Sequence, residues 1–175
     1  RIDSEDRIAI GKSTTVPEMV FGLNLGFEYK GFGIGMVFNG VSGLTKQLNV
    51  ANVHQPLRNG NTNIATWYLK DKIRWTEAMK DVANVPRLST LSNENNYQTS
   101  TQWIEDGSFL KLRNLNVYYN LPQKWVKKIK LDKLQIYAKA QNVFSIDKID
   151  YFNCEDLTLG YPDLFSVCLG LNINF

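Results

Sequence analysis

The sequence MVFGLNLGFEYKGFGIGMVFNG, residues 19–40, alternates apolar side chains with small or polar ones twice in succession. The apolar positions of its first arm are Phe21, Leu23, Leu25, Phe27 and Tyr29, and those of its second arm are Phe32, Ile34, Met36 and Phe38. Between the arms lie Lys30 and Gly31, which suit a tight turn. Because successive side chains of a strand point to opposite faces, this period of two predicts a β-hairpin with one apolar face. The glycines of GFGIG lack the spacing of a phosphate-binding loop, and we interpret them as strand residues.

Three further segments show the same alternation. In residues 109–120 the apolar positions change parity near Arg113 and Asn114, which predicts a β-bulge that preserves one apolar face. Residues 133–144 and 163–175 alternate without such a change. The apolar positions of the three segments are Leu110, Leu112, Leu115, Val117, Tyr119, Leu134, Ile136, Ala138, Ala140, Phe165, Val167, Leu169, Leu171, Ile173 and Phe175. We therefore predict an all-β fold with five antiparallel strands.

Composition argues against several functional classes. The chain has 175 residues, a mean hydropathy of -0.27 and a net charge of +3. No run approaches the roughly 18 apolar residues of a membrane helix, and the charge is too small to imply nucleic-acid binding. One histidine, His54, and two cysteines, Cys154 and Cys168, indicate neither a catalytic triad nor a metal centre. The adjacent acids Glu105 and Asp106 would point to opposite faces of a strand, so we predict no catalytic residue and no cofactor.

The connections between the predicted strands are of two kinds. Two of them are short, with about two and about ten residues, whereas the other two have about 65 and about 18 residues. Short turns at one end and long loops at the other are typical of an outer-membrane β-barrel. A strand of about 13 residues spans roughly 43 Å, which a tilt of about 40° reduces to roughly 33 Å, enough to cross an apolar band of about 25 Å. The alternative is a sandwich that buries the same apolar face against a second sheet.

The barrel interpretation divides the chain into segments. Residues 1–17 are expected in an extracellular loop, 18–43 in a hairpin, 44–107 in a long extracellular loop, 108–144 in a strand, periplasmic turn and strand, 145–162 in another extracellular loop, and 163–175 in the closing strand. The sequence begins RIDSEDR, without an initiator Met or an apolar signal segment, and we interpret it as a piece of a longer polypeptide.

Four blocks carry a family resemblance. They are DGSFLKLRNLNVYYNLPQKWVKKI (106–129), LQIYAKAQNVFSI (134–146), VPRLST (85–90) and GYPDLFSVCLGLNINF (160–175). Together they resemble the C-terminal end of SusC-like (RagA-like) TonB-dependent outer-membrane transporters of Bacteroidetes, from about Ile8 to Phe175. The last residues also resemble the signal by which the barrel-assembly machinery recognises outer-membrane proteins, with Gly170, Ile173 and Phe175 at matching positions. Cys168 departs from the polar residue that is usual in that signal.

The resemblance implies a fold and a set of partners. Such transporters have a barrel of about 22 strands with a plug domain inside it, and a SusD-like surface lipoprotein closes over them as a lid. They import glycans or peptides with energy passed from TonB through the plug. The present chain would form the last five strands, in the outer membrane, with the rest of the barrel and the plug as partners. The plug and the segment that contacts TonB belong to the N-terminal part of the family, so no residue here is assigned to either.

The long loop, residues 44–107, contains aromatic residues among many Asn, Thr and Ser residues. Exposed aromatic side chains suit stacking on a sugar or contact with a protein. The candidates for contact with the lid or the substrate are Trp67, Tyr68, Trp75, Tyr97 and Trp103. The alternative is that these rings pack the loop against itself, as a loop of this length requires to stay ordered.

Charged and polar residues are interpreted mainly as solvated or structural. The acids Asp147, Asp150, Glu155 and Asp156 cluster in one loop, but they lack a calcium-binding spacing. The basic run KWVKKIKLDK, residues 124–133, is interpreted as a solvated turn rather than a phosphate site. Polar residues expected to line the barrel interior are Asn24, Glu28, Lys111, Arg113, Asn116, Gln135, Lys139, Asn172 and Asn174.

A second function remains open at this point. A soluble all-β carbohydrate-binding module would use the Trp-bearing loop as its site and would bury the apolar face within a sandwich. Detergent dependence separates the two interpretations, because a lipid-facing band of Phe, Leu and Ile makes a chain insoluble in water.

Overall fold

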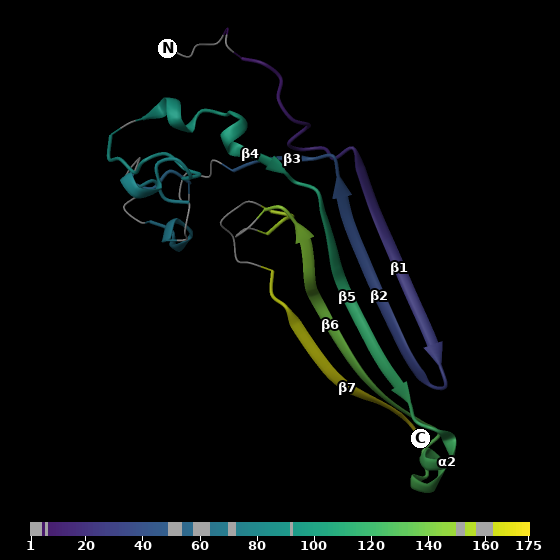
Figure 1. Cartoon of the computed structure of the whole chain (residues 1–175). Coiled ribbons are helices and arrows are strands. Elements are labelled where there is room, and N and C mark those ends of the chain that lie inside the picture. Colours follow the sequence, from purple (N-terminus) through teal and green to yellow (C-terminus); the bar gives the residue numbers. More distant parts are fainter. Residues whose placement is uncertain are drawn as a thin grey trace.

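The computed structural model describes residues 5, 7–48, 54–57, 64–69, 73–91, 93–149, 153–156 and 163–175. Five long strands form one sheet in the order β1-β2-β5-β6-β7, and every neighbouring pair is antiparallel. Their bounds are β1 Met19–Tyr29, β2 Phe32–Ser42, β5 Phe109–Asn120, β6 Lys133–Asp147 and β7 Ser166–Asn174. The long strands thus neighbour one another in chain order, as Figure 1 shows. The five predicted strands are all present.

Two tight connections lie at one end of the sheet. Lys30 and Gly31 join β1 to β2 with φ angles of 47° and 87°, the two positive values that a type I′ hairpin turn requires. Between β5 and β6 lie α2 (Gln123–Val126) and the 3₁₀ turn η6 (Lys127–Ile129). The Leu121 amide donates to the Leu134 carbonyl oxygen at 2.9 Å and closes this connection.

The register aligns apolar residues into rows that cross the whole sheet. The first row is Tyr29, Phe32, Tyr119, Ile136 and Leu171. The second row is Phe27, Ile34, Val117, Ala138 and Leu169. The third row is Leu25, Met36, Leu115, Ala140 and Val167. Since the side-chain period of a strand is two, these rows share one face, and the residues between them share the other.

Bulges keep this face continuous in the other half of the sheet. Val37 pairs with Asn114 and Phe38 pairs with Leu112, so Arg113 is an extra residue of β5. The predicted bulge is confirmed. On the other side of β5, Leu112 pairs with Phe144 and Asn114 pairs with Gln141. Between these two pairs β6 has one residue more than β5. Asn142 lies at this point with a φ of 52°, a left-handed conformation that Asn tolerates better than most residues.

β6 continues to Asp147, beyond the strand end predicted at residue 144. It does so because Phe144 and Ile146 still pair with Leu112 and Leu110 of β5. The apolar face therefore extends over one more row than the sequence pattern indicated.

The apolar face of the sheet is open. Leu169 is 77% exposed and Phe27 is 62% exposed, although neither is the terminal residue of its strand. Within the described residues no second sheet covers this face. The same residues include no helix that is long and apolar enough to cross a membrane.

The long loop forms a small folded unit at the end of the strands opposite α2 (Figure 1). A two-stranded sheet of β3 (Thr45–Gln47) and β4 (Ile104–Asp106) connects this unit to β2 and β5. Four 3₁₀ turns complete its described part: η2 Thr66–Leu69, η3 Glu77–Met79, η4 Glu94–Tyr97 and η5 Thr101–Trp103. Its buried core consists of Tyr68, Ile73, Val85, Tyr97 and Trp103.

Candidate functional site

The apolar face of the five-stranded sheet is the largest feature available for a function. Its rows present Phe, Leu, Ile, Met and Val side chains that are half-buried or exposed over five strands. Isolated exposed apolar residues are common on proteins, but a continuous surface of this kind marks contact with a partner or a membrane. The arrangement fits the lipid-facing side of a barrel wall.

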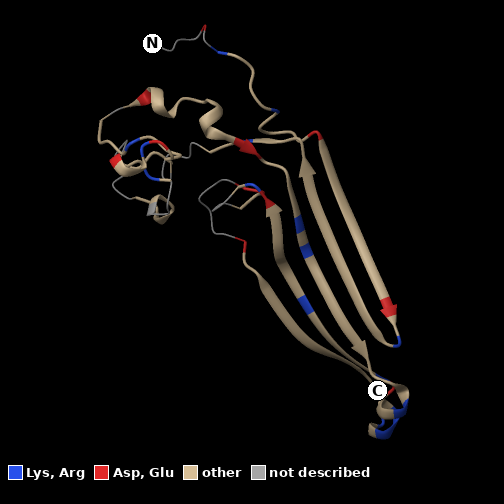
Figure 2. Cartoon of the chain, in the orientation of Figure 1, with Lys and Arg blue, Asp and Glu red and all other residues tan. Residues whose placement is uncertain are grey.

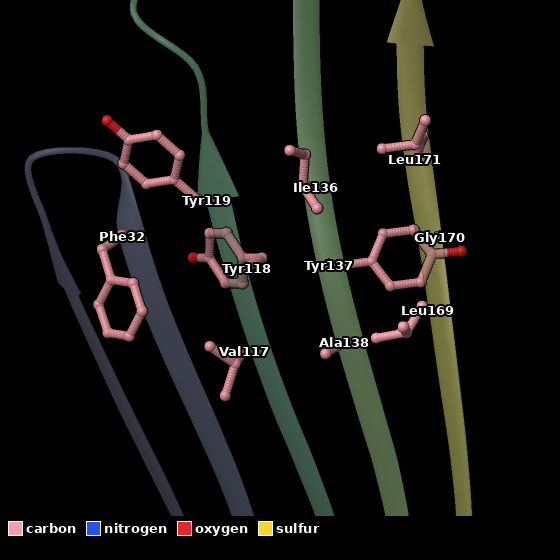
Figure 3. Close-up of a pocket in the computed structure, with 10 residues that line it drawn as sticks. All are labelled: Phe32, Val117, Tyr118, Tyr119, Ile136, Tyr137, Ala138, Leu169, Gly170 and Leu171. Carbon is pink, nitrogen blue, oxygen red and sulfur yellow. The ribbon is translucent and has the colours of Figure 1, made fainter.

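A groove of about 450 Å³ lies on the apolar face, and Figure 3 shows it in close-up. Ala138 leaves space between the larger side chains of Val117 and Leu169 in the second row. The larger side chains Tyr119, Ile136 and Leu171 of the first row border this space. The groove lies toward the end of the sheet that carries α2, because the first row is the one nearer the short turns.

The opposite face is polar. Residues of this face alternate with the apolar rows in the register, and those predicted to line a barrel interior that share it are Asn24, Glu28, Lys111, Asn116, Gln135, Lys139, Asn172 and Asn174. Arg113, also in that prediction, is the bulged residue of β5. The two faces therefore differ in chemistry in the way that a barrel wall requires, with apolar residues toward lipid and polar residues toward the lumen.

Tyrosines cover glycines on the polar face. A Cβ atom added to Gly33 would lie 2.2 Å from the ring of Tyr118, and one added to Gly170 would lie 2.4 Å from the ring of Tyr137. The Tyr118 hydroxyl donates to Glu28 at 2.6 Å, and the Lys139 ammonium lies 5.0 Å from the centre of the Tyr137 ring. The two tyrosine–glycine pairs connect neighbouring strands, in the manner of aromatic rings that cover glycines in designed sheets. They depend on register, so the alternation pattern of the sequence did not reveal them.

The three residues of the predicted assembly signal occupy different environments. Gly170 of β7 lies under the ring of Tyr137 of β6, and Ile173 of β7 pairs with Leu134 of β6. Phe175 follows the last residue of β7, and its side chain is 92% exposed. The Tyr137 ring therefore leaves little room for a side chain at position 170, whatever further part the three residues play in assembly.

A buried ion network connects β5 to the last loop. The Lys111 ammonium, 5% exposed as a residue, donates to Glu155 at 3.0 Å and to Asp163 at 2.7 Å. Arg113 also pairs with Glu155, and the Asn153 amide donates to Asp163 at 3.0 Å. Hydrogen bonding to Lys111 lowers the pKa of Asp163 below its ordinary value. Sequence reasoning placed Lys111 on the polar face but did not foresee its partners, which lie more than 40 residues away.

The same network bears on the candidate acids of the last loop. Glu155 is held by Lys111 and Arg113, while Asp150 lies outside the described residues. Within the described chain, no group of three or more His, Cys, Asp and Glu side chains is arranged to hold a metal ion. The neighbouring Cys154 is a buried free cysteine whose pKa is raised, mainly by burial and then by Asp147.

Three of the five loop aromatic residues are buried in the loop's own core. Tyr68, Tyr97 and Trp103 are between 1% and 7% exposed. The Trp103 indole donates to the Asn96 carbonyl oxygen at 2.8 Å, and the Tyr68 hydroxyl donates to the His54 carbonyl oxygen at 2.8 Å. Burial, followed by the proximity of Tyr97, raises the pKa of Tyr68. These three rings fold the loop and present little surface to a partner.

Trp67 and Trp75 remain half-buried. Trp67 lines a hollow of about 370 Å³ together with His54, Asn84, Gln102, Trp103, Glu105 and others. Trp75 lies against the guanidinium of Arg87, 5.5 Å from the ring centre. The loop therefore leaves two indole rings, one of them beside amides and a carboxylate, for contact with another molecule. His54 also packs against Trp67 and Trp103. The sequence shows that it is the single histidine but did not indicate this packing role.

Comparison with known proteins gives consistent relatives. No family model matches the chain. TonB-dependent receptor P3 of Formosa agariphila is 25% identical over 190 aligned positions, and the match covers 99% of this chain and 18% of the relative. TonB-dependent receptor P26 of the same organism is 23% identical over 192 aligned positions, and the match again covers 99% of this chain and 18% of the relative. The chain thus spans about a fifth of the length of the curated relatives it matches.

Solved structures agree with the sequence relatives. The structure of the RagAB peptide transporter matches with a TM-score of 0.72 and 25% identity, over 100% of this chain and 19% of that chain. The RagAB peptide importer in the 'closed-closed' state matches with a TM-score of 0.72 and 24% identity over the same fractions. The predicted resemblance to RagA-like TonB-dependent receptors is confirmed. TonB-dependent receptors are proteins of the outer membrane, so these relatives agree with the location predicted from the sequence.

Proposed function

We infer that the chain, as part of a TonB-dependent receptor, forms five consecutive strands in the transmembrane barrel of an outer-membrane importer. The observation that carries this inference is the register of the sheet, which aligns apolar residues on one face across all five strands and polar residues on the other. The apolar face contacts lipid, and the polar face lines the lumen. By the family resemblance, the complete barrel has about 22 strands and a plug inside.

The free edges of the sheet support a larger barrel. In the described residues β1 and β7 each pair with one strand only. An unpaired backbone N–H or C=O group in lipid costs several kcal/mol, and closure of the barrel removes this cost. The rest of the barrel is therefore the first partner of the chain, and it pairs with β1 and β7.

The orientation follows from the two kinds of connection. The short turns, at Lys30–Gly31 and at α2, face the periplasm, and the long connections face the outside. In this arrangement residues 1–17, 44–107 and 145–162 are extracellular, while 18–43, 108–144 and 163–175 contain the membrane strands. Gly170, Ile173 and Phe175 then lie near the periplasmic end of the closing strand, where the assembly machinery would recognise them.

The long loop is the proposed contact with a SusD-like lipoprotein lid. Trp67 and Trp75 keep part of their surface exposed, whereas Tyr68, Tyr97 and Trp103 hold the loop in shape. Tryptophan is among the residues that contribute most to protein interfaces. The solved relatives are described as peptide importers or transporters, so peptides are our first candidate cargo and glycans the second. TonB would act through the plug, which lies outside this chain.

The alternative of a soluble carbohydrate-binding module has less support. A sandwich needs a second layer over the apolar face, and the described residues contain no such layer. The Trp67 hollow would suit a sugar in either setting, so it does not favour the soluble module.

One purification tests the proposal. The native polypeptide that contains GLNINF is extracted from outer membranes with detergent, its intact mass is measured, and co-purifying lipoproteins are identified. We expect a mass on the order of five times 20.0 kDa, together with a surface lipoprotein. A species of about 20.0 kDa in the soluble fraction would contradict the importer and make the soluble module the better interpretation.

A further inference from the structure

The connection between β5 and β6 concentrates positive charge at one end of the sheet. Lys124, Lys127, Lys128 and Lys130 lie within seven positions of one another and are all exposed. Figure 2 shows their blue segment at the end of the sheet opposite the long loop. None of the four forms an ion pair with another described residue. Asp132 is the one acidic residue between Gln123 and Lys133.

Two large apolar side chains are exposed beside these lysines. Trp125 is 61% exposed and Ile129 is 58% exposed, while Val126 is buried and holds the turn in place. Exposed Trp next to Lys is the composition of segments that lie at a membrane surface, where the ring enters the interface and the ammonium groups meet phosphates. A turn that was only solvated would not need either apolar side chain.

The groove on the apolar face lies at the end of the sheet that carries this turn. Its outer border is the first row, which includes Ile136, and Lys133 at the start of β6 lies three residues before Ile136. Three residues of a strand span about 10 Å. The headgroup layer on each side of a bilayer is roughly 5–7 Å deep, so a lipid tail in the groove would place its phosphate near the level of Lys133, where β6 leaves the turn that carries the four lysines.

From these observations we propose that the turn and the groove together bind an anionic phospholipid of the periplasmic leaflet. The headgroup phosphate contacts the four lysines, Trp125 and Ile129 enter the interface, and an acyl chain occupies the groove beside Ala138. The lysines provide the charge complementarity, and the groove is continuous with the lipid-facing surface. The inference rests on the proposed function, because it takes the end with the short turns as the periplasmic end.

The test uses the full-length receptor in nanodiscs of phosphatidylcholine and phosphatidylglycerol. After gentle extraction, native mass spectrometry counts the lipids that stay bound. The test variant combines Lys124→Gln, Lys127→Gln, Lys128→Gln and Lys130→Gln. The matched control combines Lys12→Gln, Lys46→Gln, Lys80→Gln and Lys148→Gln, which remove the same charge at the other end of the sheet.

We expect the unmodified receptor to retain phosphatidylglycerol in preference to phosphatidylcholine. The test variant should lose at least about tenfold in retained phosphatidylglycerol, because each lysine near an anionic surface contributes a several-fold increase in binding. The control variant should retain it unchanged. Ala138→Phe fills the groove and should lower retention of both lipids while all lysines stay in place.

Two results would overturn the proposal: equal retention of phosphatidylglycerol by the test variant and the unmodified receptor, or an equal loss in the control variant. If the test variant fails to fold, a salt titration of the unmodified receptor replaces it, and retention that does not fall with rising salt counts against the lysines. Insertion into nanodiscs is scored separately. A receptor that inserts without lipid preference contradicts this inference alone, whereas one that never enters a bilayer contradicts the proposed function.

Discussion

Replacement of Gly170 by Ala tests whether a residue of the predicted assembly signal acts through packing. The added Cβ would lie 2.4 Å from the ring of Tyr137 and would need about 3.4 Å for an ordinary contact. The ring must therefore move by about 1 Å, away from its position beside Lys139. Overpacking of this kind costs about 1–3 kcal/mol. Replacing glycine also reduces the conformational entropy of the unfolded chain, which stabilises the folded state by about 0.4–1 kcal/mol. We therefore expect a net destabilisation of about 1–2 kcal/mol.

The second variant, Tyr137→Ala, removes the obstructing ring. In Gly170→Ala/Tyr137→Ala the Cβ has space, so the double variant should be about as stable as Tyr137→Ala alone. The difference between the sum of the single effects and the double effect is then about 1–2 kcal/mol. Urea unfolding of the full-length receptor in lipid vesicles gives the stabilities, and heat-dependent migration in gels shows how much folded barrel reaches the outer membrane.

A matched control uses the other tyrosine-covered glycine. Gly33→Ala meets Tyr118 at 2.2 Å and should destabilise the sheet in the same way, although Gly33 is not part of the predicted assembly signal. If Gly170→Ala lowers the amount of barrel in the membrane while Tyr137→Ala does not restore it and Gly33→Ala has no effect, the packing explanation is wrong. Recognition by the assembly machinery would then explain the need for glycine.

Three further predictions concern the loops. Lys111→Met leaves the carboxylates of Glu155 and Asp163 without their buried cation, and we expect faster protease cleavage of the last loop with little change in the barrel, as measured by limited proteolysis of the full-length receptor. Because the pKa of Asp163 is lowered in the folded state, the stability that Asp163 contributes to the last loop is present above the ordinary carboxylate pKa and is lost as the pH falls through the lowered value. Cleavage of the last loop should therefore accelerate in acid. Lys111→Met should abolish that acceleration. Trp103→Ala should unfold the long loop, because loss of a buried aromatic side chain costs about 3–5 kcal/mol. Trp67→Ala removes a half-buried ring and should raise loop cleavage much less, while it weakens co-purification of the lipoprotein. Equal cleavage in the two variants would contradict this division of roles.

The alternation of apolar residues was sufficient to predict the sheet and one of its two bulges. In β5 one extra residue, Arg113, shifts the parity of the apolar positions, and the shift is visible in the sequence. Across this bulge β6 has one residue more than β5, and β5 has one more than β2, so β6 has two more than β2. Two extra residues restore the parity, so Ala140 and Phe144 remain in phase and the sequence shows no irregularity. The left-handed conformation of Asn142, at the point where the register of β6 shifts, is visible only in the structure.

The loop was less predictable, since its aromatic residues follow no period. Trp67 and Tyr68 are neighbours in one 3₁₀ turn, yet the tyrosine is buried and the tryptophan keeps an exposed surface. Which ring enters the core depends on His54, Tyr97 and Trp103, which are distant in sequence and meet only in the folded loop. Composition could indicate that a polar loop of this length needs an aromatic core, but not which rings form it.

Alternation alone also leaves open whether an apolar face meets lipid or a second sheet, and the polar face helps to decide this. In a sandwich the outer face meets bulk water and has no need of long-range polar contacts. Here it carries Lys111, buried under a loop by Glu155 and Asp163, and tyrosines that lie across the glycines of neighbouring strands. These contacts hold the side chains of the polar face in an ordered arrangement. An organised polar face opposite an apolar face that no described layer covers is the arrangement expected when lipid replaces the second layer.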